Sequence, residues 1–258
     1  MTATDEPSAT AQEYLETIYN IAMEGDPVVG ARLTEKFGVA PPTVTATLQR
    51  LARDGYLTLD RRRGAALTAR GVAAAEATLR RHRLVERFLF ELLHMDWIAA
   101  HEEAHALEHS LSPAIEAHLV AALGDPTTCP HGNPIPGSAL AGRDYLRERG
   151  ALRLADAPPG RPLRVLCLSE VVEDETALLR QAGAAGLRPG RAVRVDAHTA
   201  GGTAVAVGER TTTTTTTLLA ALATRVWVVA DGAADSAHQA SVGDSGPRST
   251  GSGPTTRN

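Results

Sequence analysis

Apolar residues recur at helical spacing through most of the first half of the chain. Tyr14, Leu15, Ile18 and Tyr19 fall on one face of an amphipathic helix that we predict over residues 10–24. The same spacing predicts further helices over about 30–37, 42–54, 69–93, 97–109 and 112–123. This half of the chain is therefore predicted to be helical.

Short β-type runs occur in two places. Residues 56–59 and 65–68 flank a turn with three arginines and predict a β-hairpin. After residue 160 the chain alternates apolar and polar positions in several short runs, with one helix between them. We therefore expect a small barrel-like β domain over 161–231, a linker over 141–160 before it, and a disordered polar tail over 232–258.

The order of the first elements indicates a winged helix-turn-helix over residues 1–74, in a protein that is mainly α with small β parts. The second helix of such a pair enters the major groove. Small side chains in its first turn allow close approach to bases, and arginines can reach phosphates. The candidate DNA-binding residues are Ala40, Pro41, Pro42, Thr43, Thr45, Arg50, Arg53, Arg61, Arg62 and Arg63. The alternative is an ordinary three-helix core with a solvated arginine turn.

Charge is unevenly distributed along the 258 residues. The formal net charge of -4 argues against an indiscriminate nucleic-acid coat. Residues 31–90 nevertheless hold 12 Lys and Arg against 5 Asp and Glu, while 91–125 hold no Lys or Arg, seven acids and five of the 9 histidines. A basic block followed by an acidic, histidine-rich block suggests a polyanion surface beside a cation site.

The composition also bears on the compartment. Two cysteines, Cys129 and Cys167, are too few for a disulfide scaffold. The polar N-terminal segment lacks the pattern of a signal peptide, and no apolar run approaches the roughly 20 residues that span a bilayer. We expect a cytoplasmic protein with no membrane partner.

Histidines and glutamates cluster at helical spacing between residues 82 and 109. Residues 101–109 read HEEAHALEH, so His101, His105 and Glu108 share one helix face with His109 beside it. One helix earlier, His82 and Glu86 form an i, i+4 pair. Imidazole and carboxylate are natural ligands of first-row divalent metals. The alternative is a solvated acidic helix that happens to contain histidines.

One motif in this cluster has an enzymatic interpretation. His101-Glu102-x-x-His105 matches the zinc metallopeptidase pattern, in which the glutamate is the general base. The additional ligand-type residues at 108 and 109 and the preceding winged helix argue against it, so we expect no enzyme. A metal buffer without a DNA role is a third hypothesis.

Taken together, these residues resemble the diphtheria toxin repressor family of iron- and manganese-dependent regulators. The resemblance covers about 10–137 closely and 161–230 loosely. It rests on the segments EYLETIY (13–19), APPTV (40–44), RRHRLVERFL (80–89), HEEAHALEH (101–109) and DPTTCPHGNPIPG (125–137). It implies a winged helix that binds palindromic operators, a helical metal-binding and dimerisation domain over 75–140, and an SH3-like C-terminal domain.

The resemblance also implies two metal sites. The family's ancillary site falls on His82, Glu86, His101, Glu170 and Glu173, and its primary, activating site falls on Glu13, His105, Glu108 and His109. Glu16 corresponds to a carboxylate that manganese-type members use for paired metals; the alternative is that it is a surface residue of the first helix.

Departures from the family pattern concern metal and operator selectivity. Iron-type members have methionine and cysteine where Glu13 and His105 stand, whereas manganese-type members have acids at both. Without sulfur ligands the site should favour Mn2+ over Fe2+, although His105 also suits Zn2+. Ala46 replaces a glutamine of iron-type members, which points to a different operator sequence, and we expect Cys129 to pack rather than bind metal.

The sequence therefore predicts a metal-dependent repressor. When loaded with Mn2+ (or Fe2+), it would bind palindromic operator DNA as a homodimer and control metal-homeostasis genes. Metal should neutralise the acidic site, order the first helix and favour the DNA-competent dimer.

Overall fold

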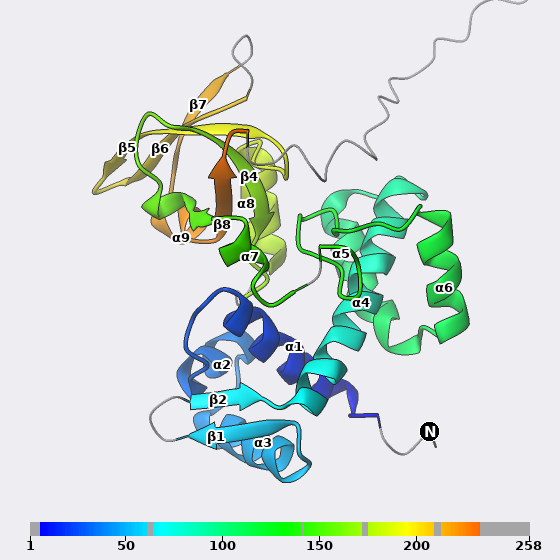
Figure 1. Ribbon diagram of the computed structural model, residues 1–258. Coiled ribbons are helices and arrows are strands. Elements are labelled where there is room, and N and C mark those ends of the chain that lie inside the picture. Colours follow the sequence, from blue (N-terminus) through cyan, green and yellow to red (C-terminus); the bar gives the residue numbers. More distant parts are fainter. Residues whose placement is uncertain (1–5, 61–63, 141, 172–174, 209–212, 233–258) are drawn as a thin grey trace, which may run out of the picture.

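The computed structural model describes residues 6–60, 64–140, 142–171, 175–208 and 213–232 (Figure 1). The candidate residues Arg61, Arg62, Arg63 and Glu173 lie outside the described residues, as does nearly all of the C-terminal tail. No described helix is both long and apolar enough to cross a membrane.

The N-terminal unit contains three helices and a hairpin, as the periodicity predicted. Its elements are α1 (Ala9–Met23), α2 (Gly30–Phe37), α3 (Pro41–Arg53), β1 (Leu57–Asp60) and β2 (Gly64–Leu67). The side chain of Ser8 caps α1, and α2 ends at Gly38 in the left-handed conformation. Gly64 has φ +82°, and a Cβ there would lie 2.1 Å from the Val28 carbonyl oxygen, so only glycine fits this start of β2.

A long helix connects this unit to a helical region. α4 (Ala69–Glu91) begins at the Thr68 cap and packs against α1 along its first half. Its second half packs against α5 (Trp97–Leu107) and α6 (Pro113–Ala122), with Leu84, Ala100 and Ile135 fully buried between them (Figure 1). α4 therefore carries side chains that face both the DNA-binding unit and the helical region.

The C-terminal domain is one antiparallel sheet of six strands in the order β3-β8-β4-β5-β6-β7. Its elements are β3 (Leu152–Arg153), β4 (Pro162–Leu168), α8 (Glu175–Ala184), β5 (Ala192–Thr199), β6 (Gly202–Val207), β7 (Thr214–Leu218), α9 (Ala220–Ala223) and β8 (Val226–Ala230); α7 (Tyr145–Glu148) precedes β3. Register shifts in β4 and β5 bend the sheet as expected for a small SH3-like domain. The expected linker 141–160 thus supplies one strand to the sheet.

The C-terminal domain packs on both other parts of the molecule. Trp97 of α5 belongs to its apolar core, which holds the domain against the helical region. On the other side, Ser169 donates a hydrogen bond to Glu24 at the end of α1, and Arg153 pairs with Glu24 and Asp26. The C-terminal domain therefore contacts both the helical region and the DNA-binding unit.

Candidate metal centre

Four elements bring the predicted ligands together. α4 presents His82 and Glu86 one turn apart, and α5 presents His101 and His105 in the same way. At the end of α5 the chain tightens into a 3-10 turn, η1 (Glu108–Ser110). Glu13 and Glu16 approach from α1, so the DNA-binding unit contributes directly to the cluster.

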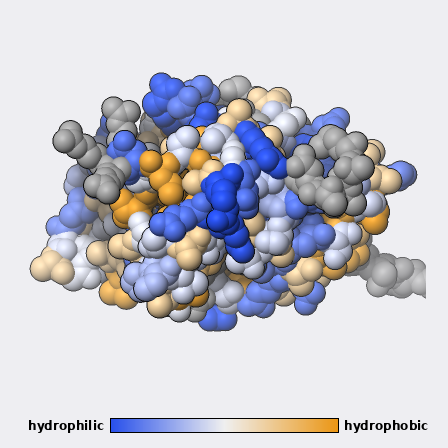
Figure 2. Space-filling view, turned by 90° about the horizontal axis from the view of Figure 1, so that it is seen from below, coloured by the Kyte–Doolittle hydropathy of each residue, from blue (hydrophilic) through white to orange (hydrophobic). Residues whose placement is uncertain are grey.

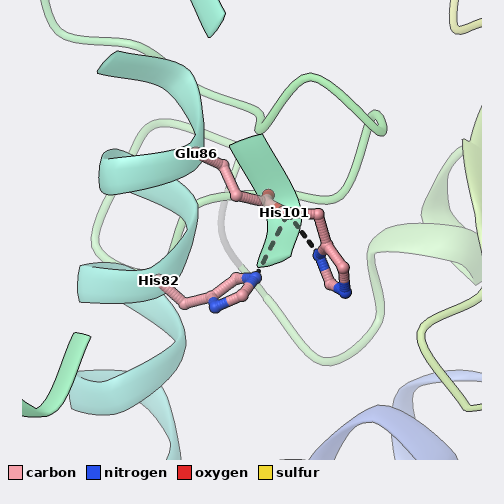
Figure 3. Close-up of side chains that lie close together, drawn as sticks. All are labelled: His82, Glu86 and His101. Carbon is pink, nitrogen blue, oxygen red and sulfur yellow. Dashed lines mark hydrogen bonds and ion pairs between the residues drawn. The ribbon is translucent and has the colours of Figure 1, made fainter. Parts of the chain in front are cut away.

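One group of ligands is buried between α4 and α5 (Figure 3). Glu86 Oε1 lies 3.2 Å from His82 Nε2 and 2.7 Å from His101 Nδ1. Burial alone would raise the pKa of Glu86, but the neighbouring His131 and His82 hold it well below its usual range. We call His82, Glu86 and His101 the buried set; its carboxylate is paired with the surrounding imidazoles.

Glu108 is the centre of a second group. Its side chain is fully buried and accepts a 2.5 Å hydrogen bond from His82 Nδ1 through Oε2. Its other oxygen, Oε1, lies 3.2 Å from His109 Nε2 and 3.6 Å from His105 Nδ1, yet has no hydrogen-bond partner among the described residues. A buried carboxylate oxygen facing two imidazoles is the arrangement a divalent cation needs.

α1 approaches this second group from the opposite side. Glu13 Oε1 is 4.0 Å from His105 Nε2, and His109 Nδ1 donates a 2.8 Å hydrogen bond to the amide oxygen of Gln12. We call Glu13, His105, Glu108 and His109 the half-open set, because the side chains of His105 and Glu13 are 57% and 34% exposed. Within this set, His105 and Glu108 have ligand atoms within 4.8 Å of one another together with His82, whereas Glu13 faces only His105 and His109 faces Glu108.

Glu16 lies one turn further along α1. Its Oε1 is buried without a hydrogen-bond partner among the described residues. Burial and the Glu108 carboxylate raise the pKa of Glu16 well above its ordinary value. An oxygen left unpaired beside another acid favours a role at the metal site over the simple surface position.

Glu170 has other partners than the sequence predicted. Its carboxylate accepts hydrogen bonds from Arg83 (2.6 Å), Asn133 (2.8 Å) and Asn20 (3.0 Å). It lines a cavity of about 350 Å³ together with His82, His101 and His105, but it belongs to none of the groups whose ligand atoms lie within 4.8 Å of one another. Arg83 is fully buried, so the structure uses Glu170 to balance that charge.

His131 was missed in the sequence. Its Nδ1 lies 3.2 Å from Glu86 Oε1, and the side chain is 3% exposed. It comes from the proline-rich loop between α6 and α7, which has no periodicity that predicts which way a side chain faces. The available signal was the residue type itself, beside Cys129 in the segment CPHGNP.

The predicted DNA-binding face is open to solvent. In α3 and just before it, all seven described candidates are exposed: Ala40, Pro41, Pro42, Thr43, Thr45, Arg50 and Arg53. The Thr45 hydroxyl donates to the Pro41 carbonyl of its own helix. Figure 2 views the molecule from the side of the N-terminal unit and shows hydrophilic residues gathered near the middle of that face.

The peptidase interpretation does not agree with the geometry. His101 turns to Glu86 and His105 to Glu108, so the two histidines of the pattern belong to different groups. Glu102, the residue that would act as base, accepts a hydrogen bond from Thr176 in α8. The motif therefore does not form a single catalytic site.

A winged helix joined to a histidine- and glutamate-lined cavity defines a metal-responsive DNA-binding protein. The profile described as "Iron dependent repressor, N-terminal DNA binding domain" matches residues 7–65, and "Iron dependent repressor, metal binding and dimerisation domain" matches 68–137. This chain belongs to that family. It is a metal-dependent transcriptional repressor and not a peptidase.

Individual relatives agree with this assignment. The chain is 37% identical over 203 residues to the iron-dependent repressor IdeR of Mycobacterium leprae, covering 77% of this chain and 88% of that one. It is 38% identical over 189 residues to the diphtheria toxin repressor of Corynebacterium efficiens, covering 72% and 82%. A solved manganese-dependent transcriptional repressor in complex with manganese superposes with a TM-score of 0.72 at 33% identity, over 85% of this chain and 99% of that one.

Proposed function

We propose that this repressor binds palindromic operator DNA as a homodimer when Mn2+ occupies the half-open set. The observation that carries the proposal is the position of Glu13. It belongs to the DNA-binding unit, yet it faces His105 of α5 across 4.0 Å, next to the hydrogen bond that joins Gln12 of α1 to His109. A cation held there would tie α1 to α5 and η1, and so fix the orientation of the recognition helix.

The residues present fit a divalent cation. Glu108 Oε1 and Glu16 Oε1 are buried acceptors without hydrogen-bond partners among the described residues. A cation supplies positive charge and directed bonds to these oxygens. The chain's part is to hold Glu108 in place through His82 and to bring Glu13 within reach of His105.

The donor set favours manganese. The half-open set offers only carboxylate oxygen and imidazole nitrogen, whereas iron selectivity is aided by softer sulfur ligands. The solved structure at 33% identity is of a manganese-dependent repressor, which points in the same direction, while IdeR is named for iron. We propose Mn2+ as activator at this primary site, with the buried set as the ancillary site.

The surface of the helical region supports dimer formation. Four large apolar side chains at the ends of α4, α5 and α6 are 42–55% exposed: Leu92, Leu93, Leu107 and Ile115. A second copy would remove this area from water. A two-fold dimer would place two recognition helices on successive major grooves, which matches a palindromic operator.

Selection from a random duplex library with Mn2+ present would test the proposal. We expect a two-fold symmetric consensus, and binding of that duplex that falls by at least about 100-fold when a chelator replaces Mn2+. Equal affinity with Mn2+ and with chelator would contradict metal activation. Titration of Mn2+, Fe2+, Zn2+ and Co2+ against the same duplex would then test the metal preference.

A further inference from the structure

One face of α3 points away from the protein core. The opposite face holds Val44, Leu48 and Leu51, which pack into the core of the N-terminal unit. Four residues on the outward side are related by i, i+3, i+4 and i+7 spacing and lie on one face, and we call them the outer face: Pro42, Thr45, Ala46 and Gln49. All four are exposed or half-exposed to solvent. The base-reading residues on the recognition helix of a homeodomain have the same spacing.

The outer face contains a single amide side chain, that of Gln49. Pro42 and Ala46 have no polar group in their side chains. The Thr45 hydroxyl already donates its hydrogen to the Pro41 carbonyl oxygen. The Gln49 side chain forms no hydrogen bond with any described residue. Its amide therefore offers both a donor and an acceptor at the surface of the helix.

The position of Gln49 along α3 sets which part of a groove it reaches. It lies seven residues after Pro42, a rise of about 10 Å along the helix axis. In DNA that distance corresponds to about three base-pair steps of roughly 3.4 Å each. Thr47, by contrast, is half-buried and hydrogen-bonds to Tyr14 of α1. Gln49 is thus placed to contact a different base pair from Pro42, with no competing partner in the chain.

We propose that Gln49 reads an adenine in each operator half-site. In the major groove an adenine presents an N7 acceptor and an N6 amino donor, which a glutamine amide matches with two hydrogen bonds. Nε2 of Gln49 donates to N7, and Oε1 accepts from the N6 amino group. This inference rests on the operator binding proposed above, and it adds the residue that selects one base pair of each half-site.

Operator selection with the unaltered chain and with Gln49→Ala tests the contact. Both proteins are loaded with Mn2+ and given the same random duplex library. One A·T pair per half-site should be fixed in the first consensus and unconstrained in the second, with the other positions unchanged. Replacing that pair by G·C should weaken binding about tenfold for the unaltered chain and less than about twofold for the variant. Because Gln49 is exposed, the substitution leaves the core unchanged.

Changes to single atoms identify the two hydrogen bonds. An adenine analogue with carbon in place of N7 still pairs with thymine but lacks the acceptor. It should weaken binding of the unaltered chain and not that of Gln49→Ala. Gln49→Glu keeps an acceptor and loses the donor, so its preference should move from adenine toward cytosine, whose N4 amino group donates. A purely structural role of Gln49 would produce neither change.

Arg50→Ala is the control on the same helix. It removes a candidate phosphate contact, so binding to all duplexes should weaken alike while the preferred base is kept. The same consensus for the unaltered chain and Gln49→Ala, both dependent on Mn2+, would overturn the Gln49 contact and leave the proposed function intact. A base preference that follows residue 49 in binding that does not need Mn2+ would contradict metal activation alone.

Discussion

The buried set and the half-open set have similar ligands but different surroundings. In the buried set, the side chains of His82, Glu86 and His101 are 1–13% exposed and come from two helices of the same region. The half-open set joins a fully buried Glu108 to a His105 that is 57% exposed and to Glu13 from another unit. The first lies within one helical region, whereas the second includes Glu13 from the DNA-binding unit, 4.0 Å from His105.

This difference indicates which site can act as a switch. A cation in a site that does not involve α1 binds equally well whatever the position of α1, so it does not change the populations of those positions. A cation that needs Glu13 in place binds the ordered position of α1 more tightly, and DNA then raises the metal affinity by the same factor. Signalling is thus expected from the half-open set and stabilisation from the buried set.

Glu170→Ala should have the largest effect, and it tests whether the C-terminal domain belongs to the buried set. The change leaves the Arg83 guanidinium buried without its carboxylate, so we expect the free energy of unfolding to fall by about 3 kcal/mol. Urea unfolding followed by tryptophan fluorescence measures this, with the exposed Glu148→Ala as control. If the variant instead keeps its stability but binds one metal ion fewer per chain, Glu170 is a metal ligand.

Glu108→Gln should weaken both sets. Its carboxylate contacts His82, His105 and His109, and the neutral amide cannot supply the charge. We expect metal affinity to fall by at least about 100-fold, or about 2.7 kcal/mol, in calorimetric titration. Glu103→Gln changes an exposed acid of the preceding helix α5 and should leave the affinity unchanged. Equal losses in both variants would mean that only the overall charge matters.

Glu13→Gln should separate the two sets. At saturating Mn2+, operator affinity measured by fluorescence anisotropy is expected to fall about tenfold, or about 1.4 kcal/mol. The buried set does not include Glu13 and should keep its metal, as equilibrium dialysis would show. Glu103→Gln again serves as control. If the variant binds less metal but its operator affinity is unchanged, α1 does not couple metal binding to DNA binding.

Glu16→Gln should have the smallest effect, and its sign depends on pH. The pKa of Glu16 in the folded chain lies well above 4.5, so its carboxyl loses a proton more readily in the unfolded chain. As the pH rises above 4.5, the free energy of unfolding of the metal-free protein therefore falls. We expect the variant to be about 1 kcal/mol more stable than the unaltered chain at pH 7.5 without metal.

That gain should vanish well below pH 4.5, where the carboxyl holds its proton in both the folded and the unfolded state. Thermal unfolding in chelator across this range measures it. With Mn2+ present, the variant should be the less stable protein if Glu16 is a ligand. A gain that does not depend on pH would show that Glu16 is ionised in the fold.

Much of the fold could be predicted because helical and strand periods are local. The predicted helices 30–37 and 69–93 agree with α2 and α4 to within two residues at each end, since their apolar positions recur over several turns. β3 was not predicted, because Leu152 and Arg153 are too short a run to show alternation. They become a strand only because β8 offers an open edge.

The sequence by itself determined which residue types lie on one helix face. His82 and Glu86 must share a face of α4, and His101 and His105 a face of α5, because helix geometry places i and i+4 side by side. Tertiary packing decided how these faces combine. In the folded chain Glu170 pairs with the buried Arg83, His131 lies beside Glu86, and Glu13 lies opposite His105. Those outcomes depend on which distant charges must be balanced in the same buried volume, and no local spacing contains that information.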